Sequence, residues 1–220
     1  MSFCLFVCLF VCFFTGALEP LRRLSNLDLF DNPALMPRLE NPPLPSGGSW
    51  SLPPTLTMLG LGLNKLRVLP ELFLQAANRS LTGLNLAGNL LFQLHRNFFA
   101  VPLGNLAALS LESCGLVSIE AGTFDRFDRL VALYLGKNQL LEIGLDVLPR
   151  GLKLLSVNYN VVPAAARRAR GVTEFRIRGT ADRFDSLTWL NVNDLTPSLN
   201  TKVPSIIRFD EVGYGSGWIW

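Results

Sequence analysis

The sequence predicts an α/β repeat solenoid, in which stacked turns each contribute one short strand to a parallel, concave β-sheet, with short helical or irregular segments on the convex side. Two observations predict this fold. The frame L-x-x-L-x-L-x-x-N recurs six times between Leu24 and Asn160, once with cysteine for asparagine and once with valine for the last leucine. Its copies begin 32, 25, 25, 24 and 22 residues apart, and all but the first step match turns of about 20–29 residues.

Each position of the frame has a physical role. Side chains alternate along a strand, so the leucines at the fourth and sixth positions point into a core while the residues between them face solvent. The asparagine at the ninth position ends the strand, and its amide offers partners to backbone groups that the turn would otherwise bury unpaired. Stacked turns are therefore expected to form a ladder of these side chains. Its members are Asn32, Asn64, Asn89, Cys114, Asn138 and Asn160.

Cys114 fits the ladder because a thiol is small, readily buried and a weak hydrogen-bond donor. No basic residue stands next to it in the sequence, and a thiol needs a positive neighbour of that kind to become reactive. We therefore expect a structural role for this cysteine.

The back halves of the turns carry aromatic residues. Phe124 and Phe127 lie three apart before Leu130, which suits a short helical turn that packs aromatic rings behind the strand. Residues 15 to 163 resemble the typical extracellular leucine-rich repeats of Toll, Slit and related adhesion and receptor proteins. The frames that begin at Leu52 and Leu148 are similar to repeats of the small leucine-rich proteoglycans. This resemblance implies a horseshoe-shaped scaffold and no particular ligand, because the repeated residues are those that build the fold.

Residues 1–17 read as a signal-peptide-like segment. An uncharged apolar run at 3–14 is followed by small residues at 15–17, and the run is shorter than the about 20 residues of a membrane span. However, no Lys or Arg precedes the run, and residues 16–24 align onto residues 122–130, the back half of a repeat. Two alternatives therefore remain: the run packs as a hydrophobic N-terminal cap, or the chain begins inside a longer repeat array. Without such a segment the chain would retain only one cysteine, Cys114.

Residues 18–163 are predicted to form the repeat array, with a proline-rich insertion at 33–54, and residues 164–220 to form degenerate C-terminal repeats or a cap. In the last segment, fragments at 172–177 and 187–192 keep only the leucine spacing. Asn78 heads the only N-x-[ST] acceptor with a permitted middle residue and is a candidate glycosylation site. Arg167–Arg170 has the R-x-x-R spacing of secretory processing sites, although arginines at the end of a helical turn also interact favourably with its dipole.

The sequence offers no catalytic, cofactor or metal site. His95 is the only histidine and is expected to be a solvated loop residue, and Ser216 lacks the glycine order of a nucleophile elbow. Residues 18–163 carry 12 Lys and Arg against 11 Asp and Glu, and residues 164–220 carry 8 against 6. This near balance gives no dense basic stripe for nucleic acid. We therefore expect a protein that is not an enzyme.

The outward positions of successive strands are expected to line up as a concave face that is rich in small, neutral residues. Small residues either let another backbone approach closely or merely relieve crowding on a curved sheet. Six strands give only ~300 Å² of flat area, less than the ~800 Å² per partner of a standard interface, so a protein ligand would also use the rims. The candidate ligand-binding residues are Asp28, Phe30, Met58, Asn85, Ser110, Glu112, Tyr134, Ser156 and Asn158.

These features predict a secreted or cell-surface module that binds a protein, peptide or matrix ligand without chemistry. Membrane association is expected only if the N-terminal segment is retained or the chain is part of a longer receptor. One alternative is an intracellular, cytoplasmic leucine-rich scaffold. A second is a noncatalytic or inhibitory subunit of a secreted enzyme. The ligand itself is not encoded in the repeated residues.

Overall fold

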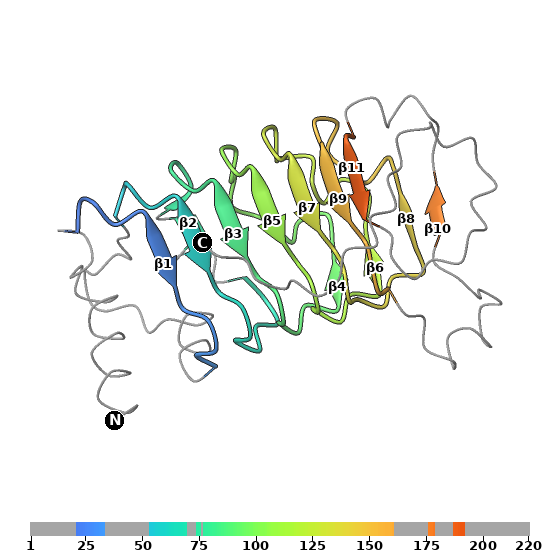
Figure 1. Cartoon of the computed structure of the whole chain (residues 1–220), viewed down its shortest axis with the longest axis horizontal. Coiled ribbons are helices and arrows are strands. Elements are labelled where there is room, and N and C mark those ends of the chain that lie inside the picture. Colours follow the sequence, from blue (N-terminus) through green and yellow to red (C-terminus); the bar gives the residue numbers. More distant parts are fainter. Residues whose placement is uncertain are drawn as a thin grey trace.

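The computed structural model describes residues 21–33, 53–69, 74–75, 77–160, 176–178 and 187–191. The predicted segment 1–17, most of the proline-rich insertion and Arg167–Arg170 lie outside these residues. In the described part, seven parallel strands form one sheet in the order β1-β2-β3-β5-β7-β9-β11, which runs along the whole array (Figure 1). The strands are β1 (Asn26–Asp28), β2 (Met58–Gly60), β3 (Gly83–Asn85), β5 (Ala108–Ser110), β7 (Ala132–Tyr134), β9 (Leu154–Ser156) and β11 (Trp189–Asn191).

The strand register follows the sequence frame without a slip. The fourth-position leucine of each turn lies opposite its counterpart in the next turn, as Leu59 does to Leu84 and Leu84 to Leu109. In β2 to β9 this leucine is buried, and the strand residues on either side of it turn to the opposite face of the sheet. The structure therefore confirms the predicted solenoid with one strand per turn.

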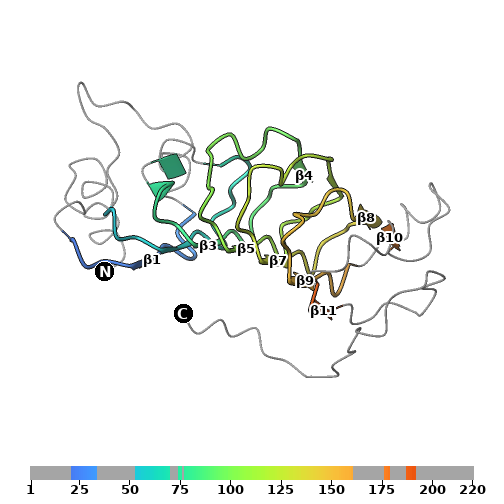
Figure 2. The same ribbon diagram turned by 90° about the horizontal axis from the view of Figure 1, so that it is seen from above.

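Four further strands of two or three residues lie on the other side of the coil, away from the seven-stranded sheet (Figure 2). They pair in parallel as β4 (Gln93–Leu94) with β6 (Ser118–Ile119), and β8 (Glu142–Gly144) with β10 (Arg176–Arg178). Between β6 and β7 the sequence predicted a short helical turn, but the chain instead forms consecutive turns. Their hydrogen bonds join residues three apart, as from Phe127 N to Phe124 O at 3.1 Å. The predicted packing still occurs, because Phe99, Phe124 and Phe127 are all buried behind the strands.

Each of the two C-terminal fragments that keep the leucine spacing contributes one strand. The strand of the first fragment, β10, pairs with β8 on the far side of the coil, whereas β11 of the second pairs with β9 in the main sheet. The two fragments therefore form opposite sides of one long turn. Thr188 N, just before β11, donates to Lys153 O at 2.8 Å, 35 residues earlier. Leucine spacing alone does not distinguish the two sides of a turn, since both sides bury apolar residues.

The asparagine side chains tie each turn to the turn before it. Asn138 Oδ1 accepts hydrogen bonds from the backbone N–H groups of Cys114 and Leu116 at 2.9 and 3.0 Å. Its Nδ2 donates to the carbonyl oxygens of Leu111 and Leu135, each at 2.9 Å. Corresponding bonds are made by Asn64, Asn89 and Asn160. Because these side chains are buried, each bond pairs a backbone group that water does not reach.

Cys114 occupies the same position with a different set of bonds. Its Sγ donates to the Leu86 carbonyl oxygen at 3.2 Å, as an asparagine Nδ2 would. A thiol has no counterpart to the amide oxygen that accepts a second backbone N–H. The Leu91 N–H instead donates to the backbone carbonyl oxygen of Cys114 at 3.2 Å. The turn thus keeps its cross-links by a small change of backbone partner.

Burial makes the Cys114 thiol inert. The side chain is 0% exposed, and desolvation raises the pKa of the thiol to about 12. Since the thiolate is the nucleophile, native protein at pH 8 is expected to leave Cys114 unalkylated by iodoacetamide, and protein in denaturant is expected to be alkylated fully. Mass spectrometry of the peptide that carries Cys114 checks this without interference from the other cysteines. Rapid labelling of native protein would contradict the buried position.

The residue before each ladder position has a left-handed backbone conformation in all six copies. The φ angles are 54° at Asp31, Leu63, Ser113 and Tyr159, 56° at Lys137 and 72° at Gly88. Most residues avoid this region, but the N–H of Leu63 and that of Lys137 each donate a 2.8 Å bond to a carbonyl of the next turn. The repeated cross-link therefore holds the conformation. It directs the side chains of this position outward along the rim where the strands end, which we call the exit rim.

Candidate ligand-binding face

The seven-stranded sheet arranges its outward side chains in rows that run across the strands. In the register, Ser110 of β5 lies between Asn85 of β3 and Tyr134 of β7, and Tyr134 lies beside Ser156 of β9. A second row lies two residues further along in each turn and includes Glu112 and Asn158. The nine candidate ligand-binding residues divide by exposure: Asp28 and Phe30 are exposed, Met58, Asn85, Glu112, Tyr134 and Asn158 are half-buried, and Ser110 and Ser156 are buried.

The glycines of this face are covered by side chains of neighbouring turns. A Cβ placed on Gly60 would clash with Asp28, and one on Gly62 would lie 2.8 Å from the ring of Phe30. A Cβ on Gly136 would lie 3.0 Å from Glu112 Oε1 and even closer to Asn158 Oδ1. At these three positions the absent side chain makes room for a neighbour within the same chain. Of the two interpretations of small residues, relief of crowding therefore applies here.

Polar oxygens gather around β5, β7 and β9. Ser156 Oγ donates to Asn158 Oδ1 at 3.0 Å. The Ser110 side chain is 7% exposed, and its Oγ is buried without a hydrogen-bond partner among the described residues. In the same part of the chain no ion pair within 4.0 Å involves Glu112. These side chains bring oxygens of three successive turns to one face, and we call Ser110, Glu112, Tyr134 and Asn158 the oxygen cluster.

Burial also shifts the titration of this cluster. Desolvation raises the pKa of the Glu112 carboxyl above its ordinary value, and the positive charge of Lys137 partly opposes this rise. Desolvation likewise raises the pKa of the Tyr134 hydroxyl, and the charge of Glu112 adds to that shift. Glu112 therefore holds its negative charge at a cost that a nearby cation would relieve.

The only histidine, His95, takes part in a surface contact with Glu120 of the next turn. His95 follows β4, and its Nδ1 lies 3.0 Å from Glu120 Oε1, which follows β6. Glu120 Oε2 also accepts the backbone N–H of Arg96 at 3.0 Å. The hydrogen bond from His95, and then that from Arg96, lower the pKa of the Glu120 carboxyl. The contact links two adjacent turns, and both side chains stay exposed.

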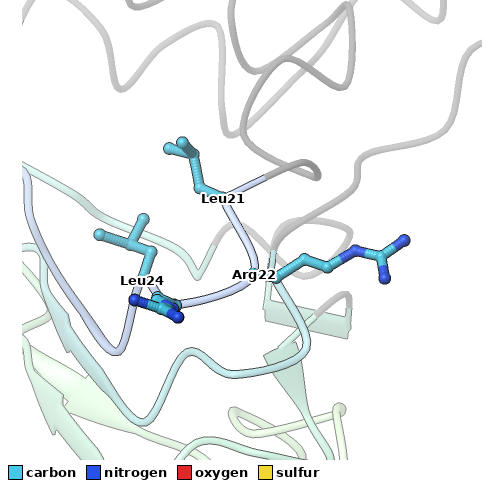
Figure 3. Close-up of a pocket in the computed structure, with 4 residues that line it drawn as sticks. Leu21, Arg22 and Leu24 are labelled. Atoms are coloured by element: carbon cyan, nitrogen blue, oxygen red, sulfur yellow. The ribbon is translucent and has the colours of Figure 1, made fainter.

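A hollow of ≈ 460 Å³ lies at the N-terminal edge of the array, before β1 (Figure 3). Among the described residues it is lined by four consecutive ones, Leu21, Arg22, Arg23 and Leu24. Arg22 points away from both leucines (Figure 3). This single stretch brings no second element, and no acidic or nucleophilic group, to the hollow.

The structure leaves the candidate sites of the sequence in separate places. Asn78 is half-buried in the turn just before Leu81, on the approach to β3 and away from the exposed surface of the sheet. Among the described residues, the Nδ2 of Asn32, the first ladder residue, donates only to the nearby Phe30 carbonyl oxygen. Across the described residues, no group of three or more His, Cys, Asp or Glu side chains could hold a metal ion. No helix in that part of the chain is long and apolar enough to span a membrane.

The oxygen cluster could not be located from the sequence. The frame places Ser110, Glu112, Tyr134 and Asn158 on one face, yet it gives no signal that Ser110 is buried without a partner. The nearest signal is Gly136, whose missing side chain admits two acceptor oxygens to one spot.

Comparison with solved structures finds leucine-rich repeat proteins at low similarity. Human 5T4 (Wnt-activated inhibitory factor 1, trophoblast glycoprotein) is 25% identical with a TM-score of 0.44, over 60% of this chain and 56% of that one. A chain of the mouse RP105/MD-1 complex is 20% identical with a TM-score of 0.47, over 66% of this chain and 23% of that one. This chain thus matches less than two thirds of either protein's length. No protein-family model and no curated protein matches the sequence.

The family follows from the chain's own repeats. Six copies of the L-x-x-L-x-L-x-x-N frame fold into turns that each give one strand to a continuous parallel sheet. Buried side chains at the ninth position join those turns. A frame of this length with a strand in each turn defines the leucine-rich repeat. The chain is therefore a leucine-rich repeat protein by its own repeats and fold.

Proposed function

We propose that this protein is a noncatalytic interaction module that acts outside the cell or at its surface and binds a protein or matrix ligand. The observation that carries the proposal is the outward face of the seven-stranded sheet, with its half-buried polar cluster and apolar residues at its edge. Half-buried polar side chains of this face, such as Glu112 and Asn158, stay partly accessible and can offer hydrogen-bond partners to a bound ligand.

The exit rim extends the area that a partner can contact. Seven strands spaced ~4.8 Å apart, with about 10 Å of exposed length, give only ~300 Å² of flat face, against ~800 Å² per side in a standard interface. Phe30 is 48% exposed, and Leu63 and Tyr159 are each 44% exposed at the strand ends. Large apolar side chains of this kind anchor many interfaces. A protein ligand would therefore contact the sheet and the exit rim together.

A steric block on the sheet tests this proposal. Ala108 is half-buried in β5, between Gly83 and Ala132 in the register, so Ala108→Trp would fill the middle of the face. We expect binding to a secreted or cell-surface ectodomain, found by screening the chain against an ectodomain array, to fall at least tenfold with this variant. Asp128→Trp adds the same side chain at an exposed position between β6 and β7 and is expected to bind normally.

Thermal melts of both variants establish that they are folded. If no ectodomain binds the folded protein, or if the two tryptophan variants bind equally well, the proposed use of the sheet face is wrong. Co-purification with an enzyme whose activity it lowers would instead favour the inhibitory subunit.

Glycosylation of Asn78 tests the proposed location. The described residues offer its side-chain amide no hydrogen bond, and the turn lies away from the outward face. For protein collected from the medium of eukaryotic cells, we expect glycosidase to lower the apparent mass, and Asn78→Gln to abolish that shift. Ser80→Ala removes the acceptor sequence while keeping the asparagine and should act identically. Protein that stays inside the cell without a glycan would favour the intracellular scaffold.

A further inference from the structure

We propose that the protein forms a weak, twofold-symmetric dimer in which the outer edge of β1 pairs antiparallel with β1 of a second copy. This inference goes beyond the proposed function, because it uses the end of the solenoid and leaves the outward face of the sheet free. β1 is the first strand of the seven-stranded sheet and has a neighbouring strand, β2, on one side only (Figure 1). An unpaired strand edge is a template for pairing with another chain.

The first argument is the hydrogen-bonding capacity of that edge. Toward β2, the Leu29 N–H donates to the Gly60 carbonyl oxygen at 2.8 Å, and the Ser25 carbonyl oxygen accepts two N–H groups of the next turn. Alternate residues of a strand direct their backbone groups to opposite edges, so Asn26 and Asp28 direct theirs to the free edge. In the described part of the chain these groups have no backbone partner. A second strand would supply one.

The second argument is the open end of the core. Leu21 is 46% exposed, whereas Phe127, at the same position of an interior turn, is 3% exposed. Leu27 is half-buried, whereas its interior counterpart Leu133 is 0% exposed. Leu21 and Leu24 also line the hollow of ≈ 460 Å³ at this end. A second copy would cover apolar surface that the neighbouring turn covers elsewhere, and burial of that surface favours association.

The third argument is the match of the edge with itself. Pairing that sets Leu27 opposite Leu27 of the second copy brings Asn26 opposite Asp28 of that copy. The backbones of these two residues can then exchange N–H···O bonds, as opposite residues of antiparallel strands do. In the same register Arg23 comes opposite Asp31 of the second copy. Opposite charges therefore meet at both ends of the paired strands.

Arg23 and Asp31 are available for this contact. Both are exposed, and among the described residues neither takes part in an ion pair within 4.0 Å. The Asp31 N–H donates to the Gly62 carbonyl oxygen at 2.9 Å, which fixes the backbone on the exit rim. Exposed charges of this kind select which surfaces meet and in which register more than they add affinity.

Sedimentation equilibrium of the full chain tests the proposal. Interfaces below about 1,200 Å² in total belong to the weak, transient class, and one pair of short strand edges falls in this class. We therefore expect monomer at low micromolar concentration and a dimer fraction that rises up to about 200 µM. A chain that stays monomeric over this range would refute the dimer.

A charge exchange locates the interface. Arg23→Glu and Asp31→Arg are each expected to weaken dimerisation at least fivefold at low salt, because each variant alone brings like charges together. An equimolar mixture of the two variants should dimerise as the unchanged chain does, since every contact again joins opposite charges. Arg129→Glu is the matched control, because Arg129 is exposed at the position of Arg23 in an interior turn. A mixture that associates no better than either variant alone would overturn the proposed register.

Hydrogen exchange followed by NMR tests the edge itself. The amides of Asn26 and Asp28 should exchange rapidly in dilute protein and become protected as the dimer forms. Protection that is already complete in the monomer would mean that the chain covers its own edge. Rapid exchange in the dimer would place the contact elsewhere. Either result contradicts the proposal.

The dimer and the proposed function can fail separately. Ala108→Trp changes the sheet face and is expected to leave dimerisation unchanged, and Arg23→Glu is expected to leave ectodomain binding unchanged. Thermal melts of dilute protein establish that every variant is folded. A monomeric chain that still binds an ectodomain would overturn the dimer alone, and a dimer that binds no ectodomain would overturn the proposed function alone.

Discussion

Asn138→Leu is expected to lower the free energy of unfolding by more than about 3 kcal/mol, since each buried group left unpaired costs about 1–3 kcal/mol. Leucine has a similar size but neither donates nor accepts hydrogen bonds. The change strands the backbone N–H groups of Cys114 and Leu116 and the carbonyl oxygens of Leu111 and Leu135. Because turns of a solenoid are stabilised by their neighbours, the loss should spread along the array. Denaturant melts followed by circular dichroism measure it.

Asn89→Leu should behave in the same way, because Asn89 is also buried and bonds the carbonyl oxygens of Leu61 and Leu86. Asn26→Leu is the matched control. Asn26 is exposed in β1 and its side chain has no hydrogen bond in the described residues, so its loss should change stability by less than about 0.5 kcal/mol. Equal effects at Asn26 and Asn138 would show that the ladder does not hold the turns together.

Asn85 falls between these cases. The sequence frame places it on the outward face, and from that position alone Asn85→Ala would be neutral. In the structure Asn85 Oδ1 accepts the Ala87 N–H at 2.9 Å. One partly buried hydrogen bond is worth about 0.5–1.5 kcal/mol, and we expect a loss of that size.

Phe124→Ala is expected to lower the free energy of unfolding by about 3–5 kcal/mol, the range for deleting a buried aromatic side chain. Phe124 is 2% exposed, and its ring centroid lies 6.1 Å from those of both Phe99 and Phe127. Phe99 and Phe127 themselves meet edge to face at 4.9 Å. Phe99 comes from one turn, and Phe124 and Phe127 come from the next. A cavity at Phe124 would therefore weaken the packing within its own turn and also the contact between the two turns. Calorimetric or denaturant melts report the effect.

Phe92→Ala provides the comparison for the aromatic cluster. Phe92 is 45% exposed, has a φ of 49°, and lies over Gly115 rather than in the core. Nearly half of its surface already meets water, so this variant should lose about 2 kcal/mol or less, clearly less than Phe124→Ala. A large loss at Phe92 and a small one at Phe124 would reverse the inferred positions of the core and the surface.

The sequence was a strong guide to the coil and a weak guide to its far side. Strand register could be predicted because a slip of one residue would turn every buried leucine into solvent, and β1 to β9 of the main sheet follow that register. The far side repeats less strictly. There Phe124 and Phe127 are buried as predicted, but consecutive turns replace the expected helical turn. The spacing of Phe124, Phe127 and Leu130 allows these residues to be buried from a helical turn or from consecutive turns alike. For the same reason β10 and β11 looked alike in sequence and belong to different sheets.

What the sequence determined by itself was the repeat length, the inward leucines and the positions of the ladder residues, because each follows from side-chain size and polarity at a fixed spacing. Only the tertiary structure decided how neighbouring turns complete one another. It showed that the Cys114 carbonyl receives a bond that an asparagine side chain would take, and that Leu63 and Lys137 have a left-handed conformation normally signalled by glycine. It also brought Glu112 and Asn158 together over Gly136. These features depend on atoms from two or three turns at once, and no local pattern within a single turn specifies them.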